Sequence, residues 1–307
     1  MKSYRIGDVI KRRRKALGMT QMQLCAGICD MSTLSKIETG RRVPFPKDTV
    51  RLLERLGLSS DIYYVLVGNE DFSLQNLELE IREHTIRKEF AEAIKLLDQI
   101  ESHQTENPFV SQFILRQRSI VGYIKDGSVH SYTPAETLEL LYKAISLTVP
   151  AFDIERIADQ FLCTEELMVI VDIAVAYTEQ QDYDTSGRIY ARLIEYISQQ
   201  CMSTEESSRI FPLIAYNYAR DLEEIGDYSK AVEISEQGRK YCIKYGKTNL
   251  MGELLATQGC ALYKQGSHAE GIRALQDACA MLRVMEKFEK HEFLKNYVRD
   301  TLCVLDF

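Results

Sequence analysis

The chain has 307 residues, of which 45% are hydrophobic and 27% are charged, with a net charge of −7. These values are close to globular averages and exclude a disordered or fibrous chain. At roughly 150 residues per domain, the length predicts about two domains. The longest apolar run, from Leu167 to Tyr177, is interrupted by Asp172 and falls short of the roughly 18 residues that a membrane span needs.

The N-terminal residues and the cysteines indicate a compartment. The segment MKSYRIGDVIKRRRK is basic but no apolar block follows it, so we expect no secretory signal. The eight cysteines are scattered and too sparse for a disulfide framework, which favours reduced thiols. These observations predict a soluble cytoplasmic protein. No motif for a cofactor occurs in the sequence, so we expect none.

Charge is distributed unevenly along the chain. Residues 1–70 contain 13 Lys and Arg against 7 Asp and Glu, whereas the remaining 237 residues contain 25 against 38. The net charges of +6 and −13 predict a small polyanion-binding module joined to an acidic body with another role. The run from Lys11 to Lys15 supplies most of the basic excess, and by itself it is equally typical of a solvated helix face.

Five short helices are predicted in the basic part. Apolar residues at helical spacing predict the first over residues 4–18. Thr20 is a good N-cap for a second helix that runs to about Gly27, and a tight connection leads to a third from about Ser32 to Glu38. The last two fit residues 48–56 and 61–67, each with an aspartate at its start as the expected cap. Short helices with a basic surface indicate a helix-turn-helix domain.

The segment TQMQLCAGICDMSTLSKIETGRRVP, which begins at Thr20, resembles the Cro/C1-type (XRE) helix-turn-helix. The pattern T-Q-x-x-L followed by S-x-x-S-K-I-E-x-G carries the resemblance. It implies that the third helix enters the major groove of double-stranded DNA and that Gln21 hydrogen-bonds a phosphate. The implied DNA-binding residues are Thr20, Gln21, Met31, Ser32, Thr33, Ser35, Lys36, Arg41 and Arg42.

Different roles are expected within this set. Lys36 is the cationic donor that guanine O6 and N7 favour, and Met31 and Thr33 are able to contact thymine methyl groups. Arg41 and Arg42 follow the third helix, so we expect them to bind phosphate rather than bases. A DNA target sequence does not follow from these residues.

Two further pairs in the head have structural interpretations. The resemblance implies a partly buried ion pair between Arg14 and Glu38, at positions that pair between the first and third helices of the family. Cys25 and Cys29 lie four residues apart with no nearby His or Cys to complete a tetrahedral metal site. We therefore expect no metal and a core position for Cys25.

The body after residues 68–71, which we expect to form a hinge, has a helical pattern throughout. The clearest unit has small residues at Ala219 and Ala231 on either side of a Gly-Asp-Tyr turn at 226–228. Forty residues later, Gly259 and Gly271 occupy the two small positions. Looser copies lie upstream, one of them with an insertion near 128–134. Such self-similarity predicts a repeat architecture.

Small residues where two helices cross, with a Gly-Asp turn between the helices, resemble tetratricopeptide (TPR) repeats. The spacing of 40–45 residues exceeds the 34 of the family, which implies longer helices or loops. The predicted fold is all-α: a helix-turn-helix domain at 1–68, then about five TPR-like hairpins in a right-handed superhelix over 69–307, with a last helix from about His291 to Val304. A generic helical bundle is the alternative.

A superhelix of this kind has a concave face that binds extended peptides or partner helices. In the predicted register, Asn217 lies on that face, where its amide is able to pair with the backbone of a bound peptide. Asp172 interrupts an apolar run on the same face and needs a partner or water. Both residues are alternatively hydrogen-bonded between repeats. The predicted peptide-binding residues are Gln117, Arg118, Asp172, Glu179, Leu213, Tyr216, Asn217, Arg220, Glu224, Tyr263 and Lys264.

The complete arrangement resembles the peptide-pheromone receptors of Gram-positive quorum sensing (the Rgg, PlcR and PrgX type). The resemblance implies a homodimer that binds a two-fold-related operator and an oligopeptide in the groove. The alternative is a repressor that acts constitutively or under a protein partner, with the repeats as a dimerisation scaffold. No Walker loop, nucleotide-binding glycine pattern or hydrolase motif occurs and the five histidines are dispersed, so we expect no enzyme.

Overall fold

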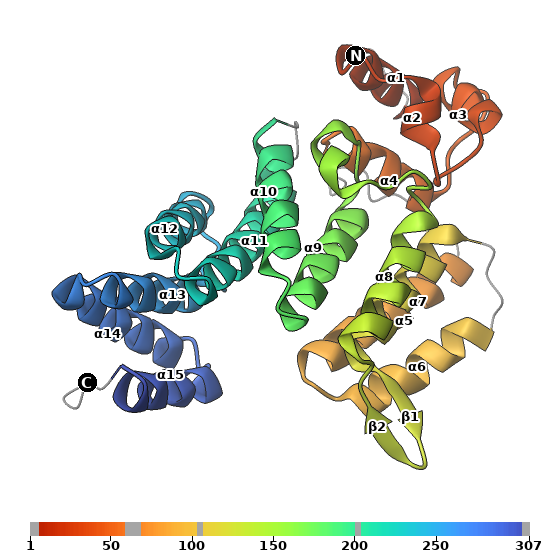
Figure 1. Cartoon of the computed structure of the whole chain (residues 1–307). Coiled ribbons are helices and arrows are strands. Elements are labelled where there is room, and N and C mark those ends of the chain that lie inside the picture. Colours follow the sequence, from red (N-terminus) through yellow and green to blue (C-terminus); the bar gives the residue numbers. More distant parts are fainter. Residues whose placement is uncertain (1–5, 59–68, 103–106, 200–203, 303–307) are drawn as a thin grey trace. The chain divides into compact units, whose positions relative to one another are not determined.

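The computed structural model describes residues 6–58, 69–102, 107–199 and 204–302, without the side chains of 46, 69–75, 204 and 205. The chain divides into two compact units. Residues up to Gln180 form the N-terminal unit, and Gln181–Ser198 together with the residues from Thr204 onward form the C-terminal unit. Helices dominate both units, as the all-α prediction requires (Figure 1).

The head of the N-terminal unit contains four described helices: α1 (Ile6–Ala16), α2 (Gln21–Cys25), α3 (Met31–Glu38) and α4 (Pro46–Arg55). Their apolar faces enclose one core with Ile10, Leu24, Leu34 and Leu52 at its centre, each inaccessible to solvent. Cys25 belongs to this core, which confirms the expectation for that residue. The first three helices lie where the sequence pattern predicts them. The predicted fifth helix at 61–67 lies outside the described residues.

A glycine permits the close crossing of α1 and α3. A Cβ atom on Gly7 would lie 1.9 Å from the carbonyl oxygen of Ile37, which is far inside van der Waals contact. Glycine normally weakens a helix by roughly 0.5–1 kcal/mol relative to alanine. At this position the missing side chain instead lets the two backbones touch, and the close contact sets the position of α3 against α1.

Helix caps differ from the predictions at two places. Asp30, expected in the connection before the third helix, is the N-cap of α3 and accepts a hydrogen bond from the Thr33 amide. The prediction that Asp48 caps α4 is wrong, because the helix begins two residues earlier at Pro46. A proline is favoured in the first helical turn since its missing N–H has no partner there in any case. Phe45 therefore takes the N-cap position.

The rest of the N-terminal unit is built from α5 (Asn69–Ile86), α6 (Phe90–Ser102), α7 (Pro108–Val121), α8 (Pro134–Ser146) and α9 (Thr164–Glu179), with a 3-10 helix at Ile154–Asp159. Consecutive helices pack in pairs, α5 on α6, α7 on α8 and α8 on α9. The prediction of a hinge at 68–71 is wrong for residues 69–71, because these residues form the first turn of α5. Residue 68 lies outside the described residues.

A small antiparallel hairpin, β1 (Tyr123–Lys125) and β2 (Ser128–His130), lies between α7 and α8. The sequence pattern did not predict these strands, although it placed an insertion at this point of the repeat. Gly122 makes the hairpin possible, because it has a φ of +79° and its Cβ would overlap the His130 carbonyl oxygen. The insertion is thus a defined element rather than a loose loop.

The C-terminal unit consists of α10 (Tyr183–Gln199), α11 (Thr204–Glu224), α12 (Tyr228–Tyr245), α13 (Met251–Lys264), α14 (His268–Val284) and α15 (Phe288–Asp300). The terminal helix begins three residues before the predicted start and ends four before the predicted end. Successive helices from α11 to α15 pack on one another (Figure 1). These antiparallel pairs are the TPR-like hairpins that the sequence repeat predicts.

The small residues of the repeat lie at helix crossings, as predicted. A Cβ on Gly259 would come within 3.0 Å of the Gly271 carbonyl oxygen, so α13 and α14 cross in backbone contact there. In the preceding hairpin, Ala219 and Ala231 are both fully buried. Among the described residues, no helix is long and apolar enough to cross a membrane.

Candidate nucleic-acid interface and ligand-binding face

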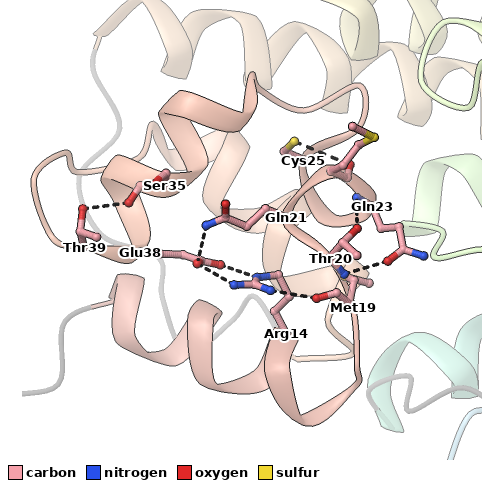
Figure 2. Close-up of polar contacts among 10 residues, drawn as sticks. Arg14, Met19, Thr20, Gln21, Gln23, Cys25, Ser35, Glu38 and Thr39 are labelled. Carbon is pink, nitrogen blue, oxygen red and sulfur yellow. Dashed lines mark hydrogen bonds and ion pairs between the residues drawn. The ribbon is translucent and has the colours of Figure 1, made fainter.

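A buried ion pair joins the first and third helices of the head. Arg14 donates from Nε to Glu38 Oε1 at 2.6 Å and from Nη2 to Oε2 at 2.8 Å (Figure 2). Its Nη1 donates to the Met19 carbonyl oxygen at 2.8 Å, just before α2. This network confirms the pair that the family resemblance implies. Because one guanidinium on α1 contacts both α3 and the segment just before α2, it holds these two helices in place relative to α1.

Gln21 belongs to the same network. Its Nε2 donates to Glu38 Oε2 at 2.9 Å, so one of its two amide hydrogens holds the helices together (Figure 2). An amide nitrogen carries two hydrogens, and the second remains for a phosphate oxygen. Arg14 and Gln21 outweigh burial and hold the pKa of Glu38 below its ordinary value. Thr20 precedes α2 as its N-cap, in a reciprocal capping box with Gln23.

Asp30 organises the beginning of α3. Its carboxylate accepts from the Ser32 hydroxyl at 2.6 Å, the Thr33 amide at 2.8 Å and the Thr33 hydroxyl at 2.7 Å. These hydrogen bonds hold the pKa of Asp30 well below its ordinary value. Thr33 is 7% exposed, so the structure places it in the cap rather than on the outer surface. Ser32 remains exposed beside it.

The outer face of the head presents the other predicted residues. Met31 is 48% exposed, Lys36 and Arg41 are exposed, and no described residue pairs with either cation. Ser35 is partly exposed one turn from Met31. The arrangement offers an apolar side chain, a hydroxyl and a cation along α3, with a second cation just after it, which suits base edges and phosphates.

Arg42 lies after α3 and is held against the head. Its Nη1 donates to the Thr33 hydroxyl at 3.1 Å and its guanidinium lies 5.6 Å from the centre of the Phe45 ring. The residue is exposed, so its remaining donors can reach a phosphate. Met22, which directly follows Gln21 and is not among the predicted residues, is 66% exposed. In the sequence, Met22 is an apolar residue outside the core positions of α2, which are Leu24 and Cys25.

The head is joined to α9 by a second buried ion pair. Arg55 on α4 donates from Nη2 to Glu166 Oε1 at 2.7 Å, and the two side chains are 1% and 0% exposed. Arg55 also donates to the carbonyl oxygens of Leu24 and Ala26 at the end of α2. Glu166 in turn accepts from the Cys163 amide at 2.7 Å. The Arg55 guanidinium therefore links the end of α2 to α9.

An ionic cluster continues from α9 into α5 and α7. Arg116 donates to Asp172 Oδ2 at 2.6 Å and to Glu165 Oε2 at 3.2 Å, and Glu165 also pairs with Arg82. The two arginines outweigh burial and hold the pKa of Glu165 below its ordinary value. The partner that the sequence argument required for Asp172 is thus Arg116, between α7 and α9. A ligand at Asp172 would have to compete with this pair.

The other predicted ligand residues of the N-terminal unit have unequal access. Gln117 is buried and accepts from the Thr85 hydroxyl at 3.3 Å. Arg118 pairs with Asp98 and Glu101 of α6. Glu179, at the end of α9, is exposed.

Helix α11 of the C-terminal unit has an accessible stripe. Leu213, Tyr216 and Asn217 are partly exposed, and Arg220 and Glu224 are exposed. The residues between them pack into the core on the opposite side. This separation is the register that the sequence predicts for α11.

Helix α13 is more closed than the prediction expects. Lys264 pairs with Glu223 at 2.9 Å and lies 5.8 Å from the Tyr297 ring centre. The Tyr263 hydroxyl donates to the Leu302 carbonyl oxygen at 3.1 Å. Both side chains are therefore engaged by neighbouring helices or by the segment after α15. No cluster of three or more His, Cys, Asp or Glu suited to a metal occurs in the described part of the chain.

Comparison with known families agrees with both parts of the chain. Residues 5–61 match a helix-turn-helix domain, and residues 78–287, more than half of the chain, match the RNPP family C-terminal domain. The chain belongs to the RNPP family. It is accordingly a helix-turn-helix transcription regulator of a peptide-responsive family, and neither matching family is one of enzymes. No curated protein matches the sequence.

Solved structures show the same fold at low identity. Bacillus thuringiensis PlcR, solved with the peptide PapR7 and DNA, is 19% identical with a TM-score of 0.60, over 95% of this chain and 99% of PlcR. ComR from S. thermophilus, solved with DNA and its signalling peptide ComS, is 15% identical with a TM-score of 0.51, over 94% and 97%. A variant of the SHP pheromone receptor Rgg2 of Streptococcus dysgalactiae is 14% identical with a TM-score of 0.50, over 97% and 100%.

Proposed function

We propose that this cytoplasmic chain regulates transcription as a homodimer that binds operator DNA through residues 1–68 and a short signalling peptide through residues 69–307. The observation that carries the proposal is the presentation of α3: a buried Arg14–Glu38 pair fixes it, while Met31 and Lys36 stay exposed. The RNPP match over 78–287 supports a peptide as the effector.

In this proposal the head reads DNA in the usual helix-turn-helix way. The exposed residues near the start of α3 contact base edges, and Gln21, Arg41 and Arg42 contact phosphates. Two heads related by a two-fold axis would read half-sites one helical turn apart, roughly 34–36 Å, or a multiple of it.

The peptide acts by binding two arrangements of the dimer unequally. A tenfold shift in population requires a difference of about 1.4 kcal/mol in binding free energy between the two arrangements. The accessible stripe of α11 supplies contacts for such a ligand, with Asn217 paired to the peptide backbone.

The test is DNA affinity on the promoter region that flanks its own gene, measured by fluorescence anisotropy. Synthetic peptides from neighbouring short reading frames are added in turn. A peptide that shifts affinity or operator choice supports the proposal. Tight binding that no peptide alters favours a constitutive or partner-gated repressor instead, and absence of specific binding refutes the assignment of the head.

Asn217→Ala separates ligand response from folding. We expect it to remove the response to an active peptide while DNA affinity stays within about twofold, since the amide has no hydrogen-bond partner among the described residues. Unfolding monitored by circular dichroism is the control. A marked loss of stability would show that the residue is structural.

A further inference from the structure

Three of the six charged residues predicted to bind the peptide are neutralised by partners within their own unit. Arg118 pairs with two carboxylates of α6, and Asp172 pairs with Arg116. On the C-terminal unit, Lys264 pairs with Glu223. A ligand gains little from a charge that already has a close partner, because it must displace that partner first.

Arg220 is the exception among the cations of this face. It is exposed on the accessible stripe of α11 and forms no ion pair with a described residue, although its charge acts at longer range on Glu223, the partner of Lys264. The guanidinium lies 5.6 Å from the ring centre of Tyr216, one turn earlier. A cation beside an aromatic ring loses less freedom when it binds a ligand, since its orientation is already restricted.

Asn217 lies beside Arg220 and Tyr216 on the accessible stripe of α11. It lies three residues before Arg220, so the two side chains are neighbours on the helix surface. Its amide is partly exposed, and no described residue hydrogen-bonds to it. An amide suits the N–H and C=O groups of a peptide backbone, and an adjacent guanidinium suits a carboxylate in a bidentate contact.

We propose that Arg220 binds a carboxylate of the peptide ligand and thereby selects peptides that carry one next to the backbone segment bound by Asn217. The carboxylate belongs to an acidic side chain or to the C-terminus of the peptide, and the two sources present the same chemistry. This inference rests on the proposed peptide-binding function and specifies its ligand.

Glu224 limits how far the ligand charge can extend. It is exposed one turn after Arg220, at the last residue of α11, and the two do not form an ion pair. A ligand with a second acidic group on that side would meet this carboxylate. Glu224→Gln is therefore expected to strengthen binding of peptides with two acidic groups, whereas Arg220→Gln weakens binding of all acidic peptides.

The experiment uses the full chain and pooled random-sequence heptapeptides, with bound peptides identified by mass spectrometry. Four pools combine a free or amidated C-terminus with the presence or absence of Asp and Glu. The proteins compared are the wild type, Arg220→Gln, Arg220→Lys and Arg273→Gln. Arg273 is a matched control, because it is exposed on α14 and has no ion-pair partner among the described residues.

We expect the wild type to enrich peptides with a carboxylate about tenfold or more over the amidated pool without Asp and Glu, as a charge-assisted bidentate contact allows. Arg220→Gln should lose this preference, Arg220→Lys should recover part of it, and Arg273→Gln should keep it. If the wild type prefers free C-termini only, the terminal carboxylate is the group bound; if it prefers Asp or Glu, a side chain is.

Two results overturn the inference and differ from each other. Enrichment that is the same in Arg220→Gln and the wild type refutes the role of Arg220 and leaves peptide binding in place. Retention of no peptide from any pool by the wild type refutes peptide binding by this face and the inference with it. Circular dichroism of each variant shows that losses arise from binding rather than unfolding.

Discussion

The Arg55–Glu166 pair makes the stability of the DNA-binding head depend on α9. Its side chains are 1% and 0% exposed, so neither charge can be solvated when the other is removed. Breaking a buried ion pair on one side typically costs 3–5 kcal/mol, which is roughly two to four powers of ten in the unfolding equilibrium. We expect Glu166→Gln to destabilise the N-terminal unit by about this amount.

The assay is urea unfolding followed by circular dichroism, with DNA affinity measured on the same samples. The matched control is Glu83→Gln, since Glu83 pairs with Arg87 on the exposed surface of α5, where such pairs contribute less than about 1 kcal/mol. Arg55→Met combined with Glu166→Met should recover much of the loss, because no charge remains buried. A Glu166→Gln variant as stable as Glu83→Gln would refute the reasoning.

Three further outcomes follow from the head. Gly7→Ala should destabilise it despite the better helix propensity of alanine, because the new Cβ would overlap the α3 backbone; thermal unfolding measures this, and an unchanged or higher Tm would contradict the crossing described. The depressed pKa of Glu38 beside Arg14 contributes stability that is present above the unfolded pKa of about 4.3 and is lost as pH falls through the folded value, so Glu38→Gln should flatten the acid limb of a stability–pH curve. Lys36→Ala should relax sequence preference, whereas Gln21→Ala should weaken binding to all duplexes alike; gel shifts on operator and scrambled duplexes showing the reverse would exchange their roles.

Periodicity and residue type determined much of this protein from the sequence. Apolar spacing and small residues such as Gly259 and Gly271 report on one helix and its next neighbour, which the chain connects by a short turn. These local patterns predicted the head, the hairpin repeats and the accessible stripe of α11. The Arg14–Glu38 pair followed from the family resemblance, because the family keeps those two positions in contact.

Only the tertiary structure decided which charges meet over long sequence distances. Arg55 and Glu166 are 111 positions apart, and nothing local in either segment marks them as partners. The same holds for Lys264, which a register argument alone leaves available to a ligand but which Glu223 of another helix neutralises. A helix pattern shows which face is buried, whereas the identity of the opposing helix depends on how all the helices pack. The packing of the helices therefore decides which charged residues of the proposed ligand face are left without an ion-pair partner.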